Sequence, residues 1–429
     1  MLGVNIEIEA PPISSYFDRR NVILASGDLP DIIYVSDMGT MYTQWSRDGL
    51  FLDLPPYLNE EYMPHAFAVL TEEALFSVTV QNEDGTTGIY SLPRVQTKPW
   101  DCYLYRGDWL EKLGLEIPTS PEEFAKVMIA FAKEDPDGNG LDDTYGWSYE
   151  PGAPEYRSMI CAFGIRPTEV PDENGNYQLI YAQPEYLEYL TWIRDMYAAG
   201  AIAPEFYLGE QNANQFVSGK IGTNYTAVVE HLITYAAKEE FKAAFPNAYI
   251  VAGTPLHAEG EEVANIYYPP QIWGNYAISA DCDDIETAIK FLDAGYTDEV
   301  NELLMFGLQG ITYETFDHER HFATKTAEQK LNADKYVTSY ATINYQCEDG
   351  GLLIANGSTE EEIETFTEAY NRIGAQTNRI PYMNGTACPG YGDVDTSIVE
   401  SGINNQMVPV YQPLLDLYAN YNNGQGFNK

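Results

Sequence analysis

The loop at residues 135–144 concentrates the residue types that bind a hard cation. It reads DPDGNGLDDT, with carboxylate or amide side chains two residues apart and Gly140 in the sixth position. Alternate side-chain oxygens around a glycine turn, followed by one backbone carbonyl, form the first half of an EF-hand calcium loop. The ligands expected from this spacing are Asp135, Asp137, Asn139, the backbone carbonyl of Leu141, and Asp143.

The second half of this loop departs from the EF-hand pattern. Gly146 occupies the twelfth position, where a full EF-hand places a bidentate glutamate. A helix is predicted before the loop, and residues 145–149 are predicted to form a strand after it. We therefore predict a structural calcium site between a helix and a strand rather than a calcium sensor. The alternative is a solvated acidic loop that binds no metal.

The elements around the loop alternate between helices and strands. Ser120 and Glu123 form a capping box with Pro121 at the first helical position, which predicts a helix that begins there. Apolar residues at helical spacing predict further helices around residues 186–197, 285–292 and 363–373. Short apolar runs predict strands at residues 31–35, 248–252 and 276–279. This alternation predicts an α/β fold with largely parallel sheets.

The charge of the chain limits its partners. Its 429 residues include 23 basic and 65 acidic side chains, which gives a net charge of -42. Such a field repels nucleic acid and anionic lipid headgroups, so both are poor partners. A halophilic origin would produce the same charge.

The cysteines and the hydropathy of the chain argue against a zinc protein, a disulfide-bonded framework and a membrane-spanning protein. The cysteines form no CxxC pair and have no histidine at metal-binding spacing, which argues against zinc. Their dispersal indicates buried thiols rather than a disulfide framework. No apolar run approaches 18 residues, so no membrane-spanning helix is predicted. The cysteines are Cys102, Cys161, Cys282, Cys347 and Cys388.

Several stretches of the sequence together carry a family resemblance. They are ASGDLPDIIY at 25–34, DGLFLDL at 48–54, YSLP at 90–93, LYRGDWLEKLGL at 104–115, FVSGKIG at 216–222, FLDAGYTDE at 291–299 and FGLQGITY at 306–313. These stretches resemble the bacterial extracellular solute-binding proteins of carbohydrate ABC importers, and the similarity follows the family's order from about residue 20 to about 420. Gln309 stands where an acidic residue is commoner in this family.

The resemblance implies a two-lobed α/β fold of the periplasmic-binding-protein type, class II. Several hinge crossings would join the lobes around a ligand cleft. Lobe 1 is expected to comprise residues 1–102 and 276–328. Lobe 2 is expected to comprise residues 103–275 and 329–429, and to carry the calcium-type loop away from the ligand.

The resemblance also implies a function, which is to capture an oligosaccharide and deliver it to the transmembrane subunits of an ABC permease. It further implies a monomer outside the cell, anchored to the surface by a lipid, in a natural protein that begins upstream of Met1. A glycoside hydrolase with two catalytic carboxylates and an oligopeptide-binding protein are the alternatives. The sequence has no GxSxG elbow, phosphate-binding glycine loop or HExxH helix, which favours a binding protein over an enzyme.

A neutral sugar needs flat aromatic surfaces and polar groups in its binding site. With 34 tyrosines and six tryptophans, the composition suits such a site. Packing inside the protein is the alternative role for Trp45 and Trp273. For Arg106 and Asp108 a structural salt bridge is favoured over a ligand contact. The candidate ligand-binding residues are Asp37, Tyr42, Trp45, Arg106, Asp108, Trp109, Asn224, Tyr225, Trp273, Tyr340 and Asn344.

Overall fold

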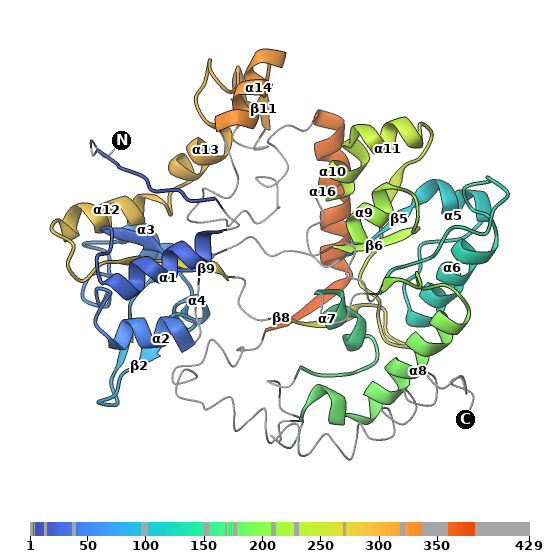
Figure 1. Cartoon of the computed structure of the whole chain (residues 1–429), viewed down its shortest axis with the longest axis horizontal. Helices are drawn as coiled ribbons and strands as arrows, with labels where there is room; N and C mark the ends of the chain where they lie inside the picture. The colour runs from blue at the N-terminus through green and yellow to red at the C-terminus, as the bar shows by residue number, and fades with distance from the viewer. Residues whose placement is uncertain are drawn as a thin grey trace.

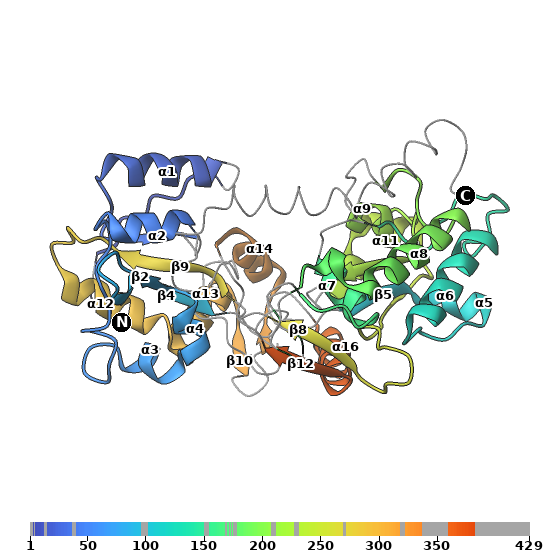
Figure 2. The same ribbon diagram turned by 90° about the horizontal axis from the view of Figure 1, so that it is seen from below.

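The computed structural model places the helices and strands in two groups that lie side by side, called lobe 1 and lobe 2 below (Figure 1). Turned by 90°, the same two groups occupy opposite halves of the molecule (Figure 2). The structure describes residues 3, 5–12, 15–36, 40–95, 102–149, 154–167, 170, 172, 174, 178–206, 212–226, 231–268, 272–317, 322–336 and 359–381.

Lobe 1 combines the first part of the chain with a later return. Its elements are α1 (Tyr16–Ser26), β1 (Ile32–Tyr34), α2 (Thr40–Arg47), α3 (Pro64–Val69), α4 (Glu72–Phe76), β2 (Thr79–Gln81), β3 (Thr87–Ile89), β4 (Leu92–Val95), β9 (Ile272–Ile278), α12 (Ile285–Ala294) and α13 (Asp298–Phe306). Its main sheet has the order β1-β9-β4. One face of this sheet packs on α3 and α12 around Leu92 and Leu292, and the other packs on α2 around Val35 and Trp45.

A small unit follows α13 and extends beyond lobe 1 (Figure 1). It contains β10 (Thr315–Asp317), β11 (Phe322–Thr324) and α14 (Ala327–Tyr336). Phe306 and Phe316, whose ring centroids lie 4.7 Å apart, belong to its own small core.

Lobe 2 contains the middle of the chain and one late helix–strand pair. Its elements are β5 (Cys102–Arg106), α5 (Gly107–Leu113), α6 (Pro121–Lys133), α7 (Pro154–Cys161), the 3-10 helix η2 (Ile180–Ala182), α8 (Pro184–Ala198), α9 (Asn212–Val217), β6 (Thr223–Thr226), α10 (His231–Ala237), α11 (Glu239–Ala244), β7 (Ile250–Ala252), β8 (Ala264–Tyr268), α16 (Glu360–Ala375) and β12 (Thr377–Pro381). Its sheets have the orders β6-β5-β7 and β12-β8. An aromatic core that includes Phe124, Trp147 and Tyr189 covers one face of the three-stranded sheet.

The helix predicted before the acidic loop is confirmed. The Ser120 hydroxyl accepts a hydrogen bond from the Glu123 backbone N–H at 3.3 Å, and Pro121 lies in the first turn. The second hydrogen bond of the capping box differs from the prediction. The Glu123 carboxylate accepts a hydrogen bond from the backbone N–H of Thr119 at 2.9 Å, one residue before the expected donor, Ser120. That hydrogen bond lowers the pKa of Glu123. The predicted apolar face of this helix is buried.

The sheets are mostly antiparallel, and the prediction of largely parallel sheets was wrong. Among the described strands, six of the seven ladders are antiparallel, and only β8 and β12 pair in parallel. The main reason is that β5 and β9 each begin just after the chain has passed over from the other lobe. Each of these strands therefore runs away from the junction, which is the side of its lobe where the two lobes join. Its two neighbours in the sheet run towards the junction.

The predicted lobe boundaries fall inside regular elements. The predicted boundary between residues 275 and 276 lies within β9, and the one between residues 328 and 329 lies within α14. Cys102, predicted as the last residue of the first segment of lobe 1, begins a strand of lobe 2. β9 pairs with two strands of lobe 1, whereas β8 pairs with β12 in lobe 2. The side-chain amide of Asn332, in α14, donates to the Ile311 carbonyl at 3.0 Å. We therefore propose that the chain changes lobes between residues 95 and 102, between 268 and 272, and after 336.

A buried carboxylate joins two helices of lobe 1. Asp293, at the end of α12, accepts backbone hydrogen bonds from His65 at 3.0 Å and Ala66 at 2.8 Å at the start of α3. We expect Asp293→Ala to lower the free energy of unfolding by about 2 kcal/mol, because the buried N–H of Ala66 and the partly buried N–H of His65 lose their acceptor. Urea unfolding measures this loss. The exposed Asp283→Ala should cost less than about 0.5 kcal/mol, and equal losses would contradict the role of Asp293.

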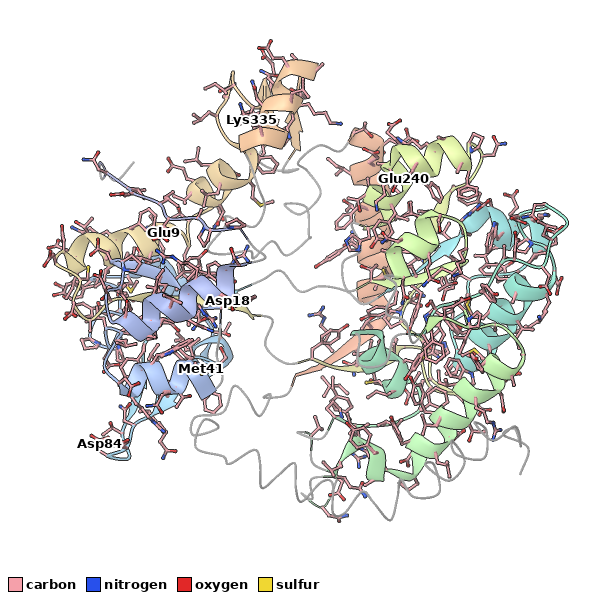
Figure 3. All side chains as sticks on the ribbon, in the orientation of Figure 1. Glu9, Asp18, Met41, Asp84, Glu240 and Lys335 are labelled. Carbon is pink, nitrogen blue, oxygen red and sulfur yellow. The ribbon has the colours of Figure 1, made fainter. Side chains whose placement is uncertain are left out.

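The excess of negative charge lies at the surface of both lobes. Acidic side chains such as Asp18, Asp84 and Glu240 are exposed and project outwards (Figure 3). Cys102, Cys161 and Cys282 are buried, as predicted, while Cys347 and Cys388 lie outside the described residues. No helix in the described part of the chain is long and apolar enough to cross a membrane.

Candidate functional site

The strand directions bring the carboxyl ends of strands from both lobes to the side where the lobes join. β4 leaves lobe 1 for lobe 2, and β1 runs parallel to it because both are antiparallel to β9. In lobe 2, β6 and β7 are both antiparallel to β5, which enters from lobe 1. Ligands of open α/β sheets bind at the carboxyl ends of strands. The two junction-facing edges are therefore the candidate site.

Three tyrosines gather at the junction-facing edge of lobe 1. Tyr34 ends β1, and Tyr276 lies opposite it in β9, with ring centroids 5.0 Å apart. Tyr16, in α1, lies 5.9 Å from the Tyr34 ring, and its hydroxyl donates to the Tyr34 carbonyl. All three side chains are half-buried. None of the three was among the ligand-binding residues predicted from the sequence, although Tyr34 lies near the end of one predicted strand and Tyr276 begins another.

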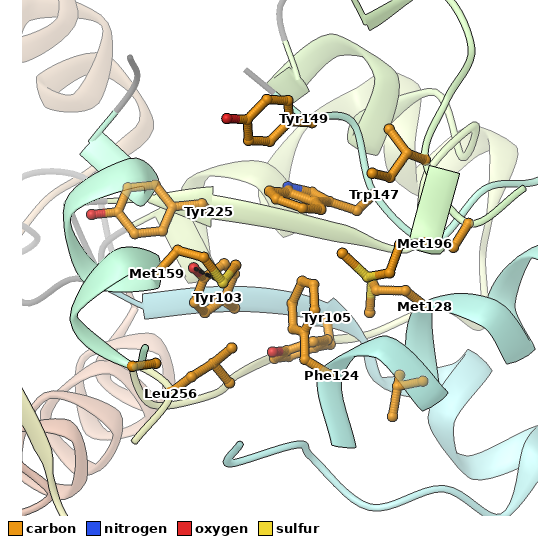
Figure 4. Packing of buried hydrophobic residues seen from close by; sticks show 14 of the residues in the cluster. Tyr103, Tyr105, Phe124, Met128, Trp147, Tyr149, Met159, Met196, Tyr225 and Leu256 are labelled. Carbon is orange, nitrogen blue, oxygen red and sulfur yellow. Dashed lines mark hydrogen bonds between the residues drawn. The ribbon is translucent and has the colours of Figure 1, made fainter. Parts of the chain in front are cut away.

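The edge of lobe 2 carries Tyr225 and a histidine. Tyr225 packs edge-on against Tyr103 at 5.4 Å, and Figure 4 shows its hydroxyl pointing out of the aromatic core. The next residue, Thr226, shares a 2.6 Å hydrogen bond with Nδ1 of His231. The His231 ring stacks on Tyr235 at 4.6 Å. Burial, with the Lys238 charge, lowers the pKa of His231 to about 4, so the ring is neutral at pH 7.

Tyr42 and Trp45 belong to the core of lobe 1, and their prediction as ligand contacts was wrong. The Tyr42 side chain is only 1% exposed, and its hydroxyl donates to the Val78 carbonyl at 2.9 Å. The Ser91 hydroxyl donates in turn to Tyr42 at 2.9 Å. The Trp45 ring is covered by the guanidinium of Arg20, which lies 5.1 Å from its centroid. Both rings fill space between α2 and the sheet.

Arg106 and Trp109 are buried at the wrong end of the lobe 2 sheet, so their prediction as ligand contacts was also wrong. Arg106 ends β5 opposite Ile250, whereas the junction-facing end of that strand is Cys102. The favoured structural salt bridge is confirmed. Arg106 binds Asp108 through two hydrogen bonds of 2.8 and 2.7 Å. Asp108 lies at the same end of the sheet, far from the junction, and both of its carboxylate oxygens accept hydrogen bonds from the Arg106 guanidinium.

The remaining candidates have mixed outcomes. Asn224 is buried in β6, and its amide donates to the Tyr225 carbonyl at 2.9 Å, so it supports the strand rather than facing a ligand. The backbone of Trp273 lies in β9, but its side chain is outside the described part of the structure. A ligand role for Tyr225 and Trp273 stays a prediction. Asp37, Tyr340 and Asn344 lie outside the described residues.

The acidic loop folds around its own backbone. The Asp135 carboxylate accepts hydrogen bonds from the N–H groups of Gly138 at 3.0 Å and Gly140 at 3.2 Å. The Asn139 side-chain nitrogen donates to Asp137 at 2.8 Å and to Asp143 at 3.2 Å. Burial and the two neighbouring carboxylates raise the pKa of Asp137.

This loop borders a cavity of about 330 Å³ in lobe 2, lined by Asp137, Asn139, Asp143, Thr144, Ser218, Gly219, Lys220 and Phe245. In the described part of the chain, no group of three or more His, Cys, Asp or Glu side chains is gathered closely enough to hold a metal. The Asn139 amide nitrogen instead lies between two carboxylates. The donor types fit calcium if this amide rotates and Oδ1 releases its 2.7 Å hydrogen bond from the Leu141 backbone N–H, because Oδ1 would then face the same space as the carboxylates.

The predicted strand after the loop is replaced by two isolated parallel bridges, Tyr145 with Ile221 and Trp147 with Ile202. Gly146 lies between them and directly against the backbone of Met128 in α6. A Cβ at this position would collide with the Met128 carbonyl. The twelfth position thus has no room for a glutamate, which explains the incomplete EF-hand pattern.

Two lobes with facing strand ends and several chain crossings define the class of two-lobed binding proteins that close on a ligand by hinge motion. The sequence agrees with this class. A family model described as bacterial extracellular solute-binding protein matches residues 2–302. The chain belongs to the family of bacterial extracellular solute-binding proteins.

Curated relatives share part of their length with this chain. Lipoprotein LipO of Bacillus subtilis is 28% identical over 326 residues, which cover 73% of this chain and 62% of LipO. The fructooligosaccharide ABC transporter substrate-binding protein FusA of Streptococcus pneumoniae is 28% identical over 222 residues, or 48% of this chain and 40% of FusA. The chain thus spans less than two thirds of the length of these two relatives.

Solved structures share the fold. An extracellular solute-binding protein from Bifidobacterium longum subsp. infantis has a TM-score of 0.62 at 16% identity, covering 97% of this chain and 85% of that protein. The FusA complex with kestose has a TM-score of 0.56 at 20% identity, covering 85% of this chain and 76% of FusA. At these identities, the likeness establishes the two-lobed fold.

Proposed function

We propose that the protein is the substrate-binding component of an ABC importer and binds an oligosaccharide between its lobes. The observation that carries this proposal is the pair of facing strand edges, each with partly or wholly buried tyrosines. Rings stack on the C–H face of a sugar, and hydroxyl groups exchange hydrogen bonds with its rim. The name of FusA, a fructooligosaccharide-binding relative, supports this substrate class.

The physical work is a shift between open and closed arrangements of the lobes. A ligand that contacts both edges stabilises the closed arrangement, because it gains contacts there that the open arrangement lacks. No bond of the sugar is made or broken. The closed protein then delivers the sugar to the transmembrane subunits of the permease. We place this work outside the cell, with a lipid anchor as in a lipoprotein such as LipO.

Isothermal titration calorimetry tests the substrate class. We expect saturable heat with at least one member of a panel of kestose, maltotriose and oligogalacturonides, and none with tri- to pentapeptides. Heat with the peptides alone would establish the oligopeptide-binding alternative. Chromatography of the same samples addresses the hydrolase alternative. Release of shorter sugars, abolished by substitution of a single carboxylate, would contradict the binding function.

We also propose that the acidic loop binds calcium, as a structural ion of lobe 2. The loop offers hard oxygen donors next to the cavity, and Asp137 and Asp143 repel each other without a cation. Two solved structures with the same fold support this. One is described as an EF-hand mutant of FusA, and the other as the alginate-binding protein AlgQ2 without calcium ion. The turn at Gly219 and Lys220, which precedes β6, lines the same cavity.

Removal of calcium tests this site. At calcium 100-fold above Kd, binding stabilises the folded state by about 2.7 kcal/mol, so we expect a chelator to lower Tm by several degrees. Asp137→Asn combined with Asp143→Asn should abolish the difference between calcium and chelator. Asp142→Asn, in the same loop but outside the predicted ligand set, should preserve it. An identical Tm of the wild-type protein in calcium and in chelator would contradict the site.

A further inference from the structure

We propose that Tyr34 and Tyr276 form the lobe 1 surface on which the oligosaccharide stacks, and that Tyr16 positions them; this role rests on the proposed function. Tyr16 and Tyr34 come from α1 and β1, which follow each other near the start of the chain, whereas Tyr276 comes from β9, far along the sequence. The three tyrosines meet at the edge of the sheet that faces lobe 2.

The register of the strands holds the two rings together. The backbone N–H of Val35 donates to the Asn275 carbonyl at 2.8 Å, so Val35 and Asn275 form a hydrogen-bonded pair. The preceding pair, Tyr34 and Tyr276, is therefore non-hydrogen-bonded. Side chains approach most closely in such pairs. The two rings are tilted by 48° and do not bury each other face to face.

A glycine makes room for this arrangement. Gly274 has φ of 93°, which favours glycine, and it lies within β9 beside the Tyr34 ring. A Cβ at this position would collide with the Tyr34 hydroxyl. Glycine weakens a strand, and its presence there marks a close approach of another group. The close approach keeps Tyr34 over the first part of β9, where the chain enters lobe 1 from lobe 2.

Partial exposure separates these tyrosines from those of the core. Tyr42, Tyr103 and Tyr105 are at most 1% exposed, whereas Tyr34 and Tyr276 are half-buried. A half-buried ring keeps a surface for a ligand and has lost the rotational freedom that binding would otherwise cost. This is the geometry that stacking on a sugar requires.

The hydroxyl groups complete the chemistry. Burial raises the pKa of Tyr276, and it raises the pKa of Tyr16 to about 12. Both hydroxyls therefore stay protonated and can donate hydrogen bonds at neutral pH. Tyr16 uses its hydroxyl on the Tyr34 carbonyl, which fixes the last residue of β1. Neutral hydroxyl groups of this kind suit a neutral sugar on a protein with a net charge of -42.

Calorimetry of alanine variants tests the stacking surface, with the panel oligosaccharide that binds the wild-type protein most tightly. We expect Tyr34→Ala and Tyr276→Ala each to weaken binding at least tenfold. Tyr62→Ala is the matched control, because Tyr62 also pairs with a tyrosine of lobe 1, Tyr57, at 5.7 Å. Its affinity should stay within about twofold of wild type. Unchanged affinity in both Tyr34 and Tyr276 variants would overturn the inference.

Hydroxyl-radical footprinting of the wild-type protein gives a second test that does not depend on the folding of variants. The saturating oligosaccharide should reduce oxidation of Tyr34 and Tyr276 at least threefold and leave that of Tyr62 unchanged. Equal oxidation with and without bound sugar would overturn the stacking surface alone. Absence of any oligosaccharide binding by the wild-type protein would instead overturn the proposed function, and the stacking surface with it.

Discussion

Asp108→Ala is expected to destabilise the protein by about 3 kcal/mol, because it leaves the charge of Arg106 buried without its partner. The Arg106 side chain is only 2% exposed, and Asp108 is 26% exposed. The guanidinium also lies over the rings of Trp109 and Phe245, at 4.8 and 4.5 Å. These rings cannot accept a full charge as a carboxylate does. Urea unfolding measures the loss.

Asp195→Ala is the matched control for this prediction. Asp195 also pairs with an arginine at 2.7 Å, but both side chains of that pair are exposed. Exposed pairs contribute at most about 1 kcal/mol, so this variant should unfold like the wild type. If Asp108→Ala kept its stability and lost affinity for the oligosaccharide, the favoured structural role of the Arg106 salt bridge would be wrong.

Gly146→Glu restores the twelfth residue of an EF-hand, yet we expect it to destabilise lobe 2 by about 3 kcal/mol and to leave calcium affinity no higher. The reason is the contact between Gly146 and the backbone of Met128 in α6. Any Cβ must push this helix away, and overpacking of this kind typically costs about 1–3 kcal/mol. A helix backbone cannot move aside as a flexible side chain would.

Leu141→Glu provides the control for the added charge. It places the same side chain in the same loop, at a residue that is 62% exposed. We expect its free energy of unfolding to change by less than about 1 kcal/mol. Tighter calcium binding in Gly146→Glu, with unchanged stability, would show that the loop closes around calcium as a full EF-hand does. That result would contradict the packing explanation for glycine at this position.

Local patterns in the sequence predicted helices well. The apolar face of α6 is buried as its spacing indicated, and Ile363, Phe366, Tyr370 and Ile373 of α16 are buried too. The start of α16 shows a full capping box between Thr359 and Glu362, which the same rule could have found. Such features depend on neighbouring residues only. They survive into the fold because no distant contact is needed to form them.

Strand direction was harder to predict, since it depends on where the chain crosses between lobes. Arg106 follows a predicted crossing, which made it a reasonable ligand candidate. The crossing strand β5, however, runs away from the junction and carries Arg106 to its far end. The short apolar runs gave no information on direction, because parallel and antiparallel buried strands have the same composition.

Predicting the residues of the candidate site requires knowing which aromatic side chains are buried, and the residue type alone does not reveal this. Tyr42 and Trp45 are aromatic residues near a predicted strand end, which indicated a ligand site, yet both fill the core of lobe 1. Nothing in the local sequence indicated Tyr34 and Tyr276, because only the pairing of β1 with β9 brings them together. A tyrosine in a short strand looks the same in sequence whether it packs inside or faces a ligand.

Small-angle X-ray scattering of the protein with and without a saturating oligosaccharide tests the central claim most directly. If the sugar binds between the lobes and contacts both facing edges, saturation should reduce the radius of gyration as the lobes close. Calorimetry on the same samples establishes that the sites are filled. Complete binding with an unchanged radius of gyration and scattering curve would contradict the account, because the sugar would then occupy a site that does not join the lobes.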